Sequence, residues 1–114
     1  MTNRSRAHAR IGIVGAGFVA DFYLRALQHV RGHDVTVLAA RSEAKGREVA
    51  ERYGVPNVVA STSELVARDD VDLVIVALPH DLHVATVEEI AAAGKAVICT
   101  KPLGRNSAEA RRCL

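Results

Sequence analysis

Short runs of apolar residues alternate with amphipathic segments along the chain. Five runs are rich in Val, Ile, Leu and Ala and are typical of buried β-strands. These runs occupy residues 11–14, 35–40, 57–60, 71–78 and 96–100. The segments between and after these runs have one of two helix signals. Some have apolar residues at every third or fourth position, and others begin with helix-capping residues. The helices are expected over residues 19–30, 42–53 and 82–93, with shorter ones opening at 61 and 106.

Capping residues define the ends of several of these helices. Ser42 is expected to cap the second helix, and Gly54 is expected to end it in a left-handed conformation. Ser61 and Glu64 have the spacing of a capping box, which predicts a short third helix. Asp81 is expected to cap the helix that follows the fourth strand.

Strands that alternate with helices and are apolar throughout predict a parallel sheet with helices on both faces. The expected fold class is therefore α/β, a doubly wound parallel sheet of the Rossmann type with strand order 3-2-1-4-5. In such a sheet a crevice forms where the order reverses, at the carboxyl ends of the first and fourth strands. Residues 1–9 are interpreted as a flexible arm and residues 10–114 as the domain.

Composition narrows the class of protein. With 49% apolar and 25% charged residues, the 114-residue chain has an ordinary globular composition. A net charge of +2 and 4% aromatic residues give no reason to expect a nucleic-acid partner. No apolar run reaches the roughly 20 residues of a membrane helix, so no membrane partner is expected. Cys99 and Cys113 have no zinc-ligand spacing, no metal is predicted, and without an export signal the expected location is cytoplasmic.

A glycine-rich turn joins the first strand to the first helix. It has the pattern GxGxxA and consists of Gly15, Ala16, Gly17, Phe18, Val19 and Ala20. Between a strand and a helix this pattern is typical of a dinucleotide-binding site. Gly15 permits the tight turn, Gly17 lets a pyrophosphate approach the backbone, and Ala20 lets helix and strand pack closely. Residues 15–19 are candidate cofactor-binding residues at the helix N-terminus, and the alternative is a tight turn without a ligand.

The residues after the second strand bear on which dinucleotide binds. A carboxylate at this point would accept hydrogen bonds from a ribose 2′-hydroxyl, but the chain has Arg41 and Ser42 and no acid before Glu43. A guanidinium and a hydroxyl suit a 2′-phosphate, which predicts that NADP is preferred, with NAD possible. In the alternative reading, Arg41 is a solvated loop residue and Ser42 only a helix cap.

Two further segments follow strands that border the crevice. Leu78, Pro79 and His83 come after the fourth strand and are candidate cofactor contacts, although a histidine at a helix start is more often a local hydrogen-bonding residue. Lys101 ends the fifth strand, on the side where the nicotinamide would lie. There its ammonium group could exchange a proton with a substrate hydroxyl or carbonyl oxygen, which makes it the candidate catalytic residue. The alternative for Lys101 is a surface lysine at a strand end.

Taken in order and spacing, four segments resemble the amino-terminal half of the Gfo/Idh/MocA oxidoreductase family, which includes glucose–fructose oxidoreductase and inositol dehydrogenase. They are residues 15–20, 77–83, 94–99 and 100–103, and the resemblance covers about residues 9 to 114. It implies an NAD(P)-binding Rossmann domain followed by a larger α/β domain that forms the substrate pocket and the oligomer contacts. The family's catalytic lysine would be Lys101, and its Pro-x-x-x-His loop would be Pro79 and His83. Thr100 stands where the family usually has Glu.

Three hypotheses remain open from the sequence. The first is the cofactor domain of an NADP(H)-dependent oxidoreductase acting on a sugar, cyclitol or related hydroxyl compound, with the substrate domain outside this chain and no turnover by this chain alone. The second is a stand-alone or truncated dinucleotide-binding module without turnover. The third is another Rossmann enzyme such as a semialdehyde or homoserine dehydrogenase, against which the Thr-Lys-Pro element at residues 100–102 argues.

Overall fold

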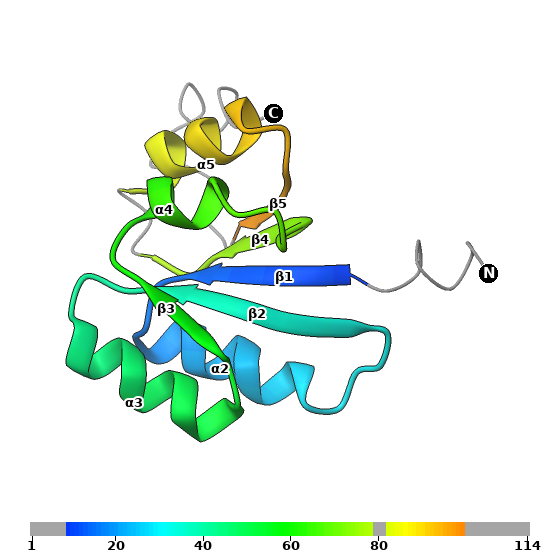
Figure 1. Cartoon of the computed structure of the whole chain (residues 1–114), viewed down its shortest axis with the longest axis vertical. Helices are drawn as coiled ribbons and strands as arrows, with labels where there is room; N and C mark the ends of the chain where they lie inside the picture. The colour runs from blue at the N-terminus through cyan, green and yellow to red at the C-terminus, as the bar shows by residue number, and fades with distance from the viewer. Residues whose placement is uncertain (1–8, 79–81, 100–114) are drawn as a thin grey trace.

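The computed structural model describes residues 9–78 and 82–99. Within these ranges the strands and helices alternate along the chain (Figure 1). The strands are β1 (Ala9–Val14), β2 (His33–Ala39), β3 (Asn57–Val59), β4 (Leu73–Val76) and β5 (Ala96–Cys99). The helices are α2 (Phe18–Leu27), α3 (Glu43–Tyr53), α4 (Thr62–Val66) and α5 (His83–Ala92).

The strands form one parallel sheet in the order β3-β2-β1-β4-β5, which confirms the predicted 3-2-1-4-5 topology. Ile13 in β1 is paired with Leu38 in β2 on one side and with Ile75 in β4 on the other. The chain order reverses between β1 and β4, so their carboxyl ends flank a crevice at one edge of the sheet.

Helices cover both faces of the sheet, with α2 and α3 on one face and α4 and α5 on the other (Figure 1). Successive strand residues point to opposite faces. Ile13 therefore packs with Leu24 of α2 in one core cluster, and Val14 packs with Ile90 of α5 in the other. Both faces are apolar, which explains why the strands lack polar alternation.

The predicted caps of α3 and α4 are present. The Ser42 side chain accepts a hydrogen bond from the Lys45 backbone N–H, and Gly54 ends α3 at φ 74°. The Ser61 side chain accepts one from the N–H of Glu64. The Glu64 carboxylate reaches back to the N–H of Ala60, one residue earlier than in a standard capping box. The predicted Asp81 cap and the helix predicted from residue 106 lie outside the described residues.

The prediction for α2 was wrong in two respects. The helix ends at Leu27 and does not continue to Val30, and Phe22 and Val30, which belong to the apolar repeat that predicts the helix, are exposed. Its buried residues are Ala20 and Leu24, one turn apart. Val19, Tyr23 and Leu27 are partly buried against the same core cluster. The face of the helix that meets the sheet is thus rotated from the one that its apolar pattern indicates. The first strand also starts earlier than expected, because β1 begins at Ala9, within the segment interpreted as the arm.

Polar side chains join the two helices on one face of the sheet. Asp21 of α2 accepts hydrogen bonds at Oδ1 from the Tyr53 hydroxyl at 2.7 Å and from Arg52 at 2.8 Å, both from the end of α3. The hydrogen bond from Tyr53 is the main cause that holds the pKa of Asp21 below its usual value of 3.8, with smaller contributions from Arg52 and Arg25. No helix among the described residues has the length and apolar character needed to span a membrane.

Candidate functional site

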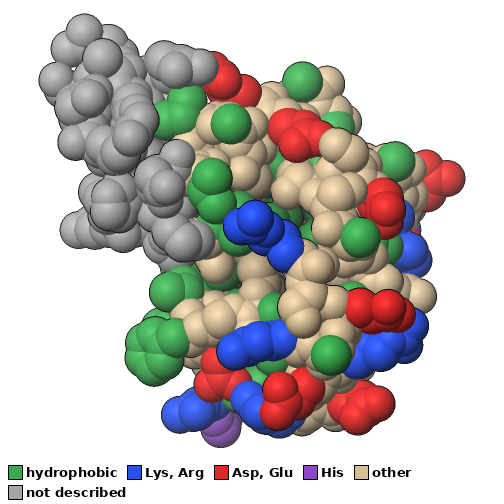
Figure 2. Space-filling view, turned by 90° about the vertical axis from the view of Figure 1, so that its left-hand side faces the viewer, with side chains coloured by type: hydrophobic (Ala, Val, Ile, Leu, Met, Phe, Trp, Pro, Cys, Tyr) green, Lys and Arg blue, Asp and Glu red, His purple; other side chains and the backbone are tan. Residues whose placement is uncertain are grey.

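A cleft of about 590 Å³ opens at the carboxyl edge of the sheet. Figure 2 shows this edge, where basic side chains lie among hydrophobic ones. The walls come from the turn after β1, the segment after β2, the loop after β3 and the two ends of the β4–α5 connection. The residues that line the cleft are Val14, Gly15, Ala16, Gly17, Ala39, Ala40, Arg41, Ser42, Lys45, Ala60, Ser61, Thr62, Leu78 and Leu82.

Gly15 brings the end of β1 close to both neighbouring strands. Its N–H donates to the carbonyl oxygen of Ala39 at 2.8 Å, and its φ of 121° favours glycine. A Cβ at this position would lie 2.3 Å from the carbonyl oxygen of Ala77. Gly15 is therefore required by the geometry of the turn itself.

Gly17 differs from Gly15 because nothing in the described structure occupies the space beside it. Its φ of −94° and ψ of −156° are extended, and a Cβ would meet no atom within 4 Å. The residue lines the cleft and is the N-cap of α2, where no side chain caps the helix. The first turn of α2 thus directs backbone N–H groups and the positive end of the helix dipole to this end of the cleft.

Phe18 and Val19 are not among the residues that line the cleft. The Phe18 side chain is 84% exposed. What these two predicted residues can offer a ligand is their backbone N–H groups at the helix start. Ala20, the third small residue of the motif, is fully buried against the sheet, as its predicted packing role requires.

Two basic side chains line the cleft beside β2. They are Arg41 and Lys45, and neither makes a hydrogen bond or ion pair through its side chain with another described residue. Ser42 lies between them, and its hydroxyl accepts from the Lys45 N–H at 3.3 Å while keeping its own proton to donate. Sequence reasoning missed Lys45, although its place one turn after the cap was a usable signal.

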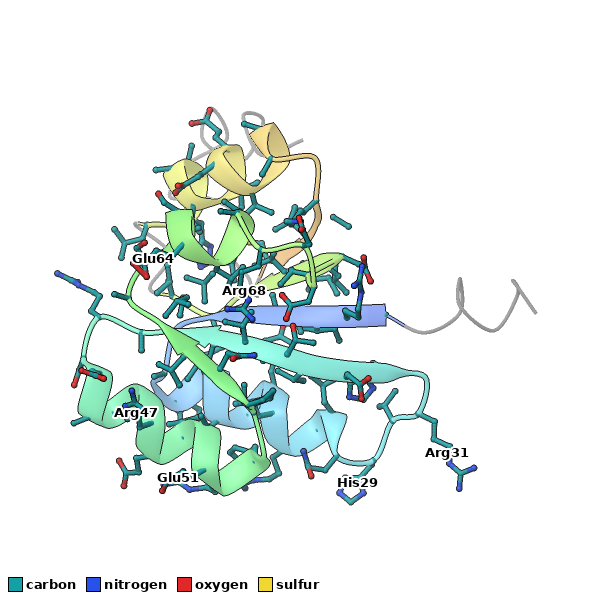
Figure 3. All side chains as sticks on the ribbon, viewed as in Figure 1. His29, Arg31, Arg47, Glu51, Glu64 and Arg68 are labelled. Atoms are coloured by element: carbon teal, nitrogen blue, oxygen red, sulfur yellow. The ribbon has the colours of Figure 1, made fainter. Side chains whose placement is uncertain are left out.

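No carboxylate is found among the described residues that line this cleft. The nearest one in sequence, Glu43, accepts hydrogen bonds at Oε2 from Arg47 at 2.8 and 3.0 Å. Figure 3 labels Arg47 on α3 and Glu64 on α4. Glu43 and Glu64 instead border a smaller adjoining pocket of about 280 Å³. The described residues that line the main cleft therefore carry a net positive charge.

The remaining predicted residues fall into three groups. Leu78 lines the cleft together with Leu82, which sequence reasoning missed. His83 is 1% exposed and does not line the cleft, and its Nε2 lies 2.8 Å from the Leu78 carbonyl oxygen. Pro79 and Lys101 lie outside the described residues.

The loop after β3 lines the cleft beside the segment that follows β2. It contributes Ala60, Ser61 and Thr62, none of which was predicted to belong to the site. The sequence indicates Ser61 only as a helix cap, and its position at the cleft depends on the pairing of β3 with β2. Taken together, the cleft offers helix-terminal amides, two cations and apolar walls. This combination suits an elongated ligand with phosphate groups and flat apolar rings.

Comparison with known proteins agrees with this description. Residues 9–114 match the model of an oxidoreductase family with an NAD-binding Rossmann fold. The rabbit (Oryctolagus cuniculus) trans-1,2-dihydrobenzene-1,2-diol dehydrogenase is 39% identical over 101 residues, which are 87% of this chain and 31% of that protein. The chain thus spans about a third of the length of the curated relatives it matches.

Solved structures show the same arrangement. A 3-ketoreductase from Actinomadura kijaniata in complex with NADP superimposes with a TM-score of 0.87 at 34% identity, over 93% of this chain and 34% of that one. A putative myo-inositol dehydrogenase from Sinorhizobium meliloti gives a TM-score of 0.84 at 28% identity, over 92% of this chain and 31% of that one.

Proposed function

Since the chain belongs to the Gfo/Idh/MocA family of oxidoreductases and carries its NAD-binding Rossmann domain, we propose that the cleft binds NADP(H) in preference to NAD(H). The ligand's diphosphate lies at the start of α2 beside Gly17, and its 2′-phosphate lies between Arg41 and Lys45. Phe18 and Val19 contribute backbone N–H groups to the diphosphate, and Leu78 contacts the half of the ligand nearer β4.

The observation that carries this proposal is a pair of cations whose side chains have no partner among the described residues. Arg41 and Lys45 face a cleft that contains no acidic side chain among the described residues. Lys45 also lies in the first turn of α3, where the helix dipole disfavours a positive charge. A bound phosphate would compensate for that unfavourable position, and a ribose hydroxyl would not. The related 3-ketoreductase was solved with NADP, which is consistent with this reading.

Substitution of the two cations tests the proposal. We expect Arg41→Gln and Lys45→Gln each to weaken NADPH binding roughly tenfold, because each removes a charged hydrogen bond. NADH binding should change little, since it has no phosphate at this position. Arg31→Gln removes the same charge from the segment before β2, at the opposite end of the sheet, and serves as the matched control (Figure 3).

Isothermal titration of each variant with both nucleotides gives the result. Equal losses for NADPH and NADH would contradict a role in 2′-phosphate recognition. So would a loss of NADPH affinity in the Arg31 control as large as that in the two variants.

We propose that the protein acts on a hydroxyl or carbonyl group of a sugar, cyclitol or related polyol, in the cytoplasm, and that Lys101 exchanges the proton of the substrate oxygen. When bound, the nicotinamide supplies the hydride donor or acceptor. Substrate contacts and oligomer contacts are assigned to a further domain, matching the two thirds of the relatives that lie outside the aligned region.

Lys101 has a separate test. In a form of the protein that turns over substrate, Lys101→Ala should reduce the turnover rate strongly and leave dinucleotide affinity unchanged, because the lysine acts on the substrate oxygen. Turnover that is unchanged in this variant would remove Lys101 from the mechanism.

A further inference from the structure

His83 is a buried titratable side chain that lies next to the cleft but outside its lining. It is the first residue of α5 and is 1% exposed. Its Nε2 lies 2.8 Å from the carbonyl oxygen of Leu78, five residues earlier. A carbonyl oxygen only accepts hydrogen bonds, so Nε2 must carry the proton and donate it.

This hydrogen bond joins the two ends of the connection between β4 and α5. Leu78 follows β4, packs against the core cluster beneath α4 and α5, and also lines the cleft. Leu82 immediately precedes His83 and lines the cleft as well, with 38% of its surface exposed. Residues 79–81 lie outside the described residues. The imidazole thus holds in place the backbone from which two cleft-lining side chains extend.

We infer that His83 is a positioning residue for dinucleotide binding, which fixes the Leu78 and Leu82 wall without touching the ligand. The inference rests on the proposed function and refines the expectation that His83 contacts the cofactor directly. A side chain with 1% exposure has almost no surface to offer a ligand, whereas its hydrogen bond restrains the wall. Without that restraint, binding must also order the wall, and affinity falls by that cost.

The sheet order determines which part of the ligand depends on His83. Leu78 and Leu82 belong to the β4 side of the cleft, while Arg41 and Lys45 belong to the β2 side, and β1 with its glycine turn lies between. A ligand that occupies only the β2 side should therefore not depend on the histidine. Adenosine 2′,5′-bisphosphate is such a ligand, because it lacks the nicotinamide half.

Two variants of the chain test the inference. His83→Leu removes the donor, and His83→Gln keeps a side-chain N–H at a position similar to Nε2. For His83→Leu, we expect the Kd of NADPH to rise roughly fivefold, the equivalent of one neutral hydrogen bond, and that of adenosine 2′,5′-bisphosphate to change less than about twofold. His83→Gln should bind NADPH nearly as the unmodified chain does. Unchanged NADPH affinity in His83→Leu, or a parallel loss for both ligands, would overturn the inference.

If His83→Leu does not fold, His83→Asn replaces it, because its shorter amide does not reach Leu78. An NMR spectrum of the imidazole nitrogens in the unmodified chain provides an independent readout. We expect a protonated, slowly exchanging Nε2 with or without nucleotide, and an unprotonated Nε2 would overturn the inference. Failure of the unmodified chain to bind any dinucleotide would refute the proposed function instead, while the spectrum would still report on the hydrogen bond.

Discussion

Gly15 and Gly17 stand two residues apart in one motif, and the structure predicts opposite consequences for their substitution. Gly17→Ala places a methyl group in the open cleft, where it meets no protein atom within 4 Å. The change restricts the unfolded chain, which stabilises by about 0.4–1 kcal/mol, and it exchanges glycine for a poorer N-cap, which costs a similar amount. Stability should therefore change by less than about 1 kcal/mol.

Binding should respond quite differently to Gly17→Ala. The added methyl group occupies the space through which a diphosphate reaches the N–H groups of α2. Loss of close contact with even one charged hydrogen-bonding group costs about 1.5–3 kcal/mol, so the Kd of NADPH should rise by roughly tenfold or more.

Gly15→Ala should lower the stability of the folded chain. Its Cβ would lie 2.3 Å from the Ala77 carbonyl oxygen, a backbone atom that cannot rotate away, and its φ of 121° adds strain of about 1–3 kcal/mol. We expect a total loss of more than about 3 kcal/mol, a large part of the stability of a small domain. Gly54→Ala is the matched control, because φ at Gly54 is 74° but a Cβ there would meet nothing within 4 Å.

Urea unfolding and titration with NADPH measure the two effects separately. Gly15→Ala should lose much more stability than Gly54→Ala, and Gly17→Ala should lose affinity while its unfolding midpoint stays close to that of the unmodified chain. Normal NADPH affinity in Gly17→Ala would refute the placement of the diphosphate beside this residue. A Gly15→Ala variant no less stable than Gly54→Ala would refute the steric reasoning.

Three further predictions concern the core, the charged contacts and the activity. Leu24→Ala empties a fully buried site under α2 and should cost about 2–5 kcal/mol in urea unfolding, whereas Val30→Ala, at an exposed position, should cost far less. The pKa of Asp21 is lowered in the folded chain, so its contribution to stability is present above 3.8 and is lost as the pH falls below that value. Tyr53→Phe removes the main cause of that shift, and unfolding midpoints should then fall less steeply below pH 4 than in the unmodified chain; an identical slope would contradict this. The 114-residue chain should bind dinucleotide but show no nicotinamide reduction with polyols, and measurable turnover would contradict the assignment of substrate contacts to another domain.

The sequence was most informative where a local rule determines the structure. Ser42 and Gly54 delimit α3 as predicted, because capping depends on a few adjacent residues. The strand order also followed from general rules, since apolar strands joined by helices permit few topologies. The glycine motif marked one end of the cleft, and the structure then separated the steric role of Gly15 from the open position of Gly17.

Features that depend on tertiary packing were less predictable. Phe22 and Val30 fit a helical apolar pattern, yet α2 packs on the sheet through Ala20 and Leu24, with Val19, Tyr23 and Leu27 partly buried beside them. Lys45 carries no motif of its own and enters the cleft only because α3 begins there. The sequence places His83 near the crevice, whereas its burial and its hydrogen bond to Leu78 arise from how α5 packs beside β4.

The central claim is that this cleft binds a nicotinamide dinucleotide and distinguishes the 2′-phosphate. Parallel titrations of the unmodified chain with NADPH and NADH test it most directly. The positive cleft with Arg41 and Lys45 predicts that NADPH binds at least roughly tenfold tighter, a difference of about 1.4 kcal/mol. Equal affinities would contradict the assignment of the two cations to the 2′-phosphate, and the absence of binding by either nucleotide would contradict the claim as a whole.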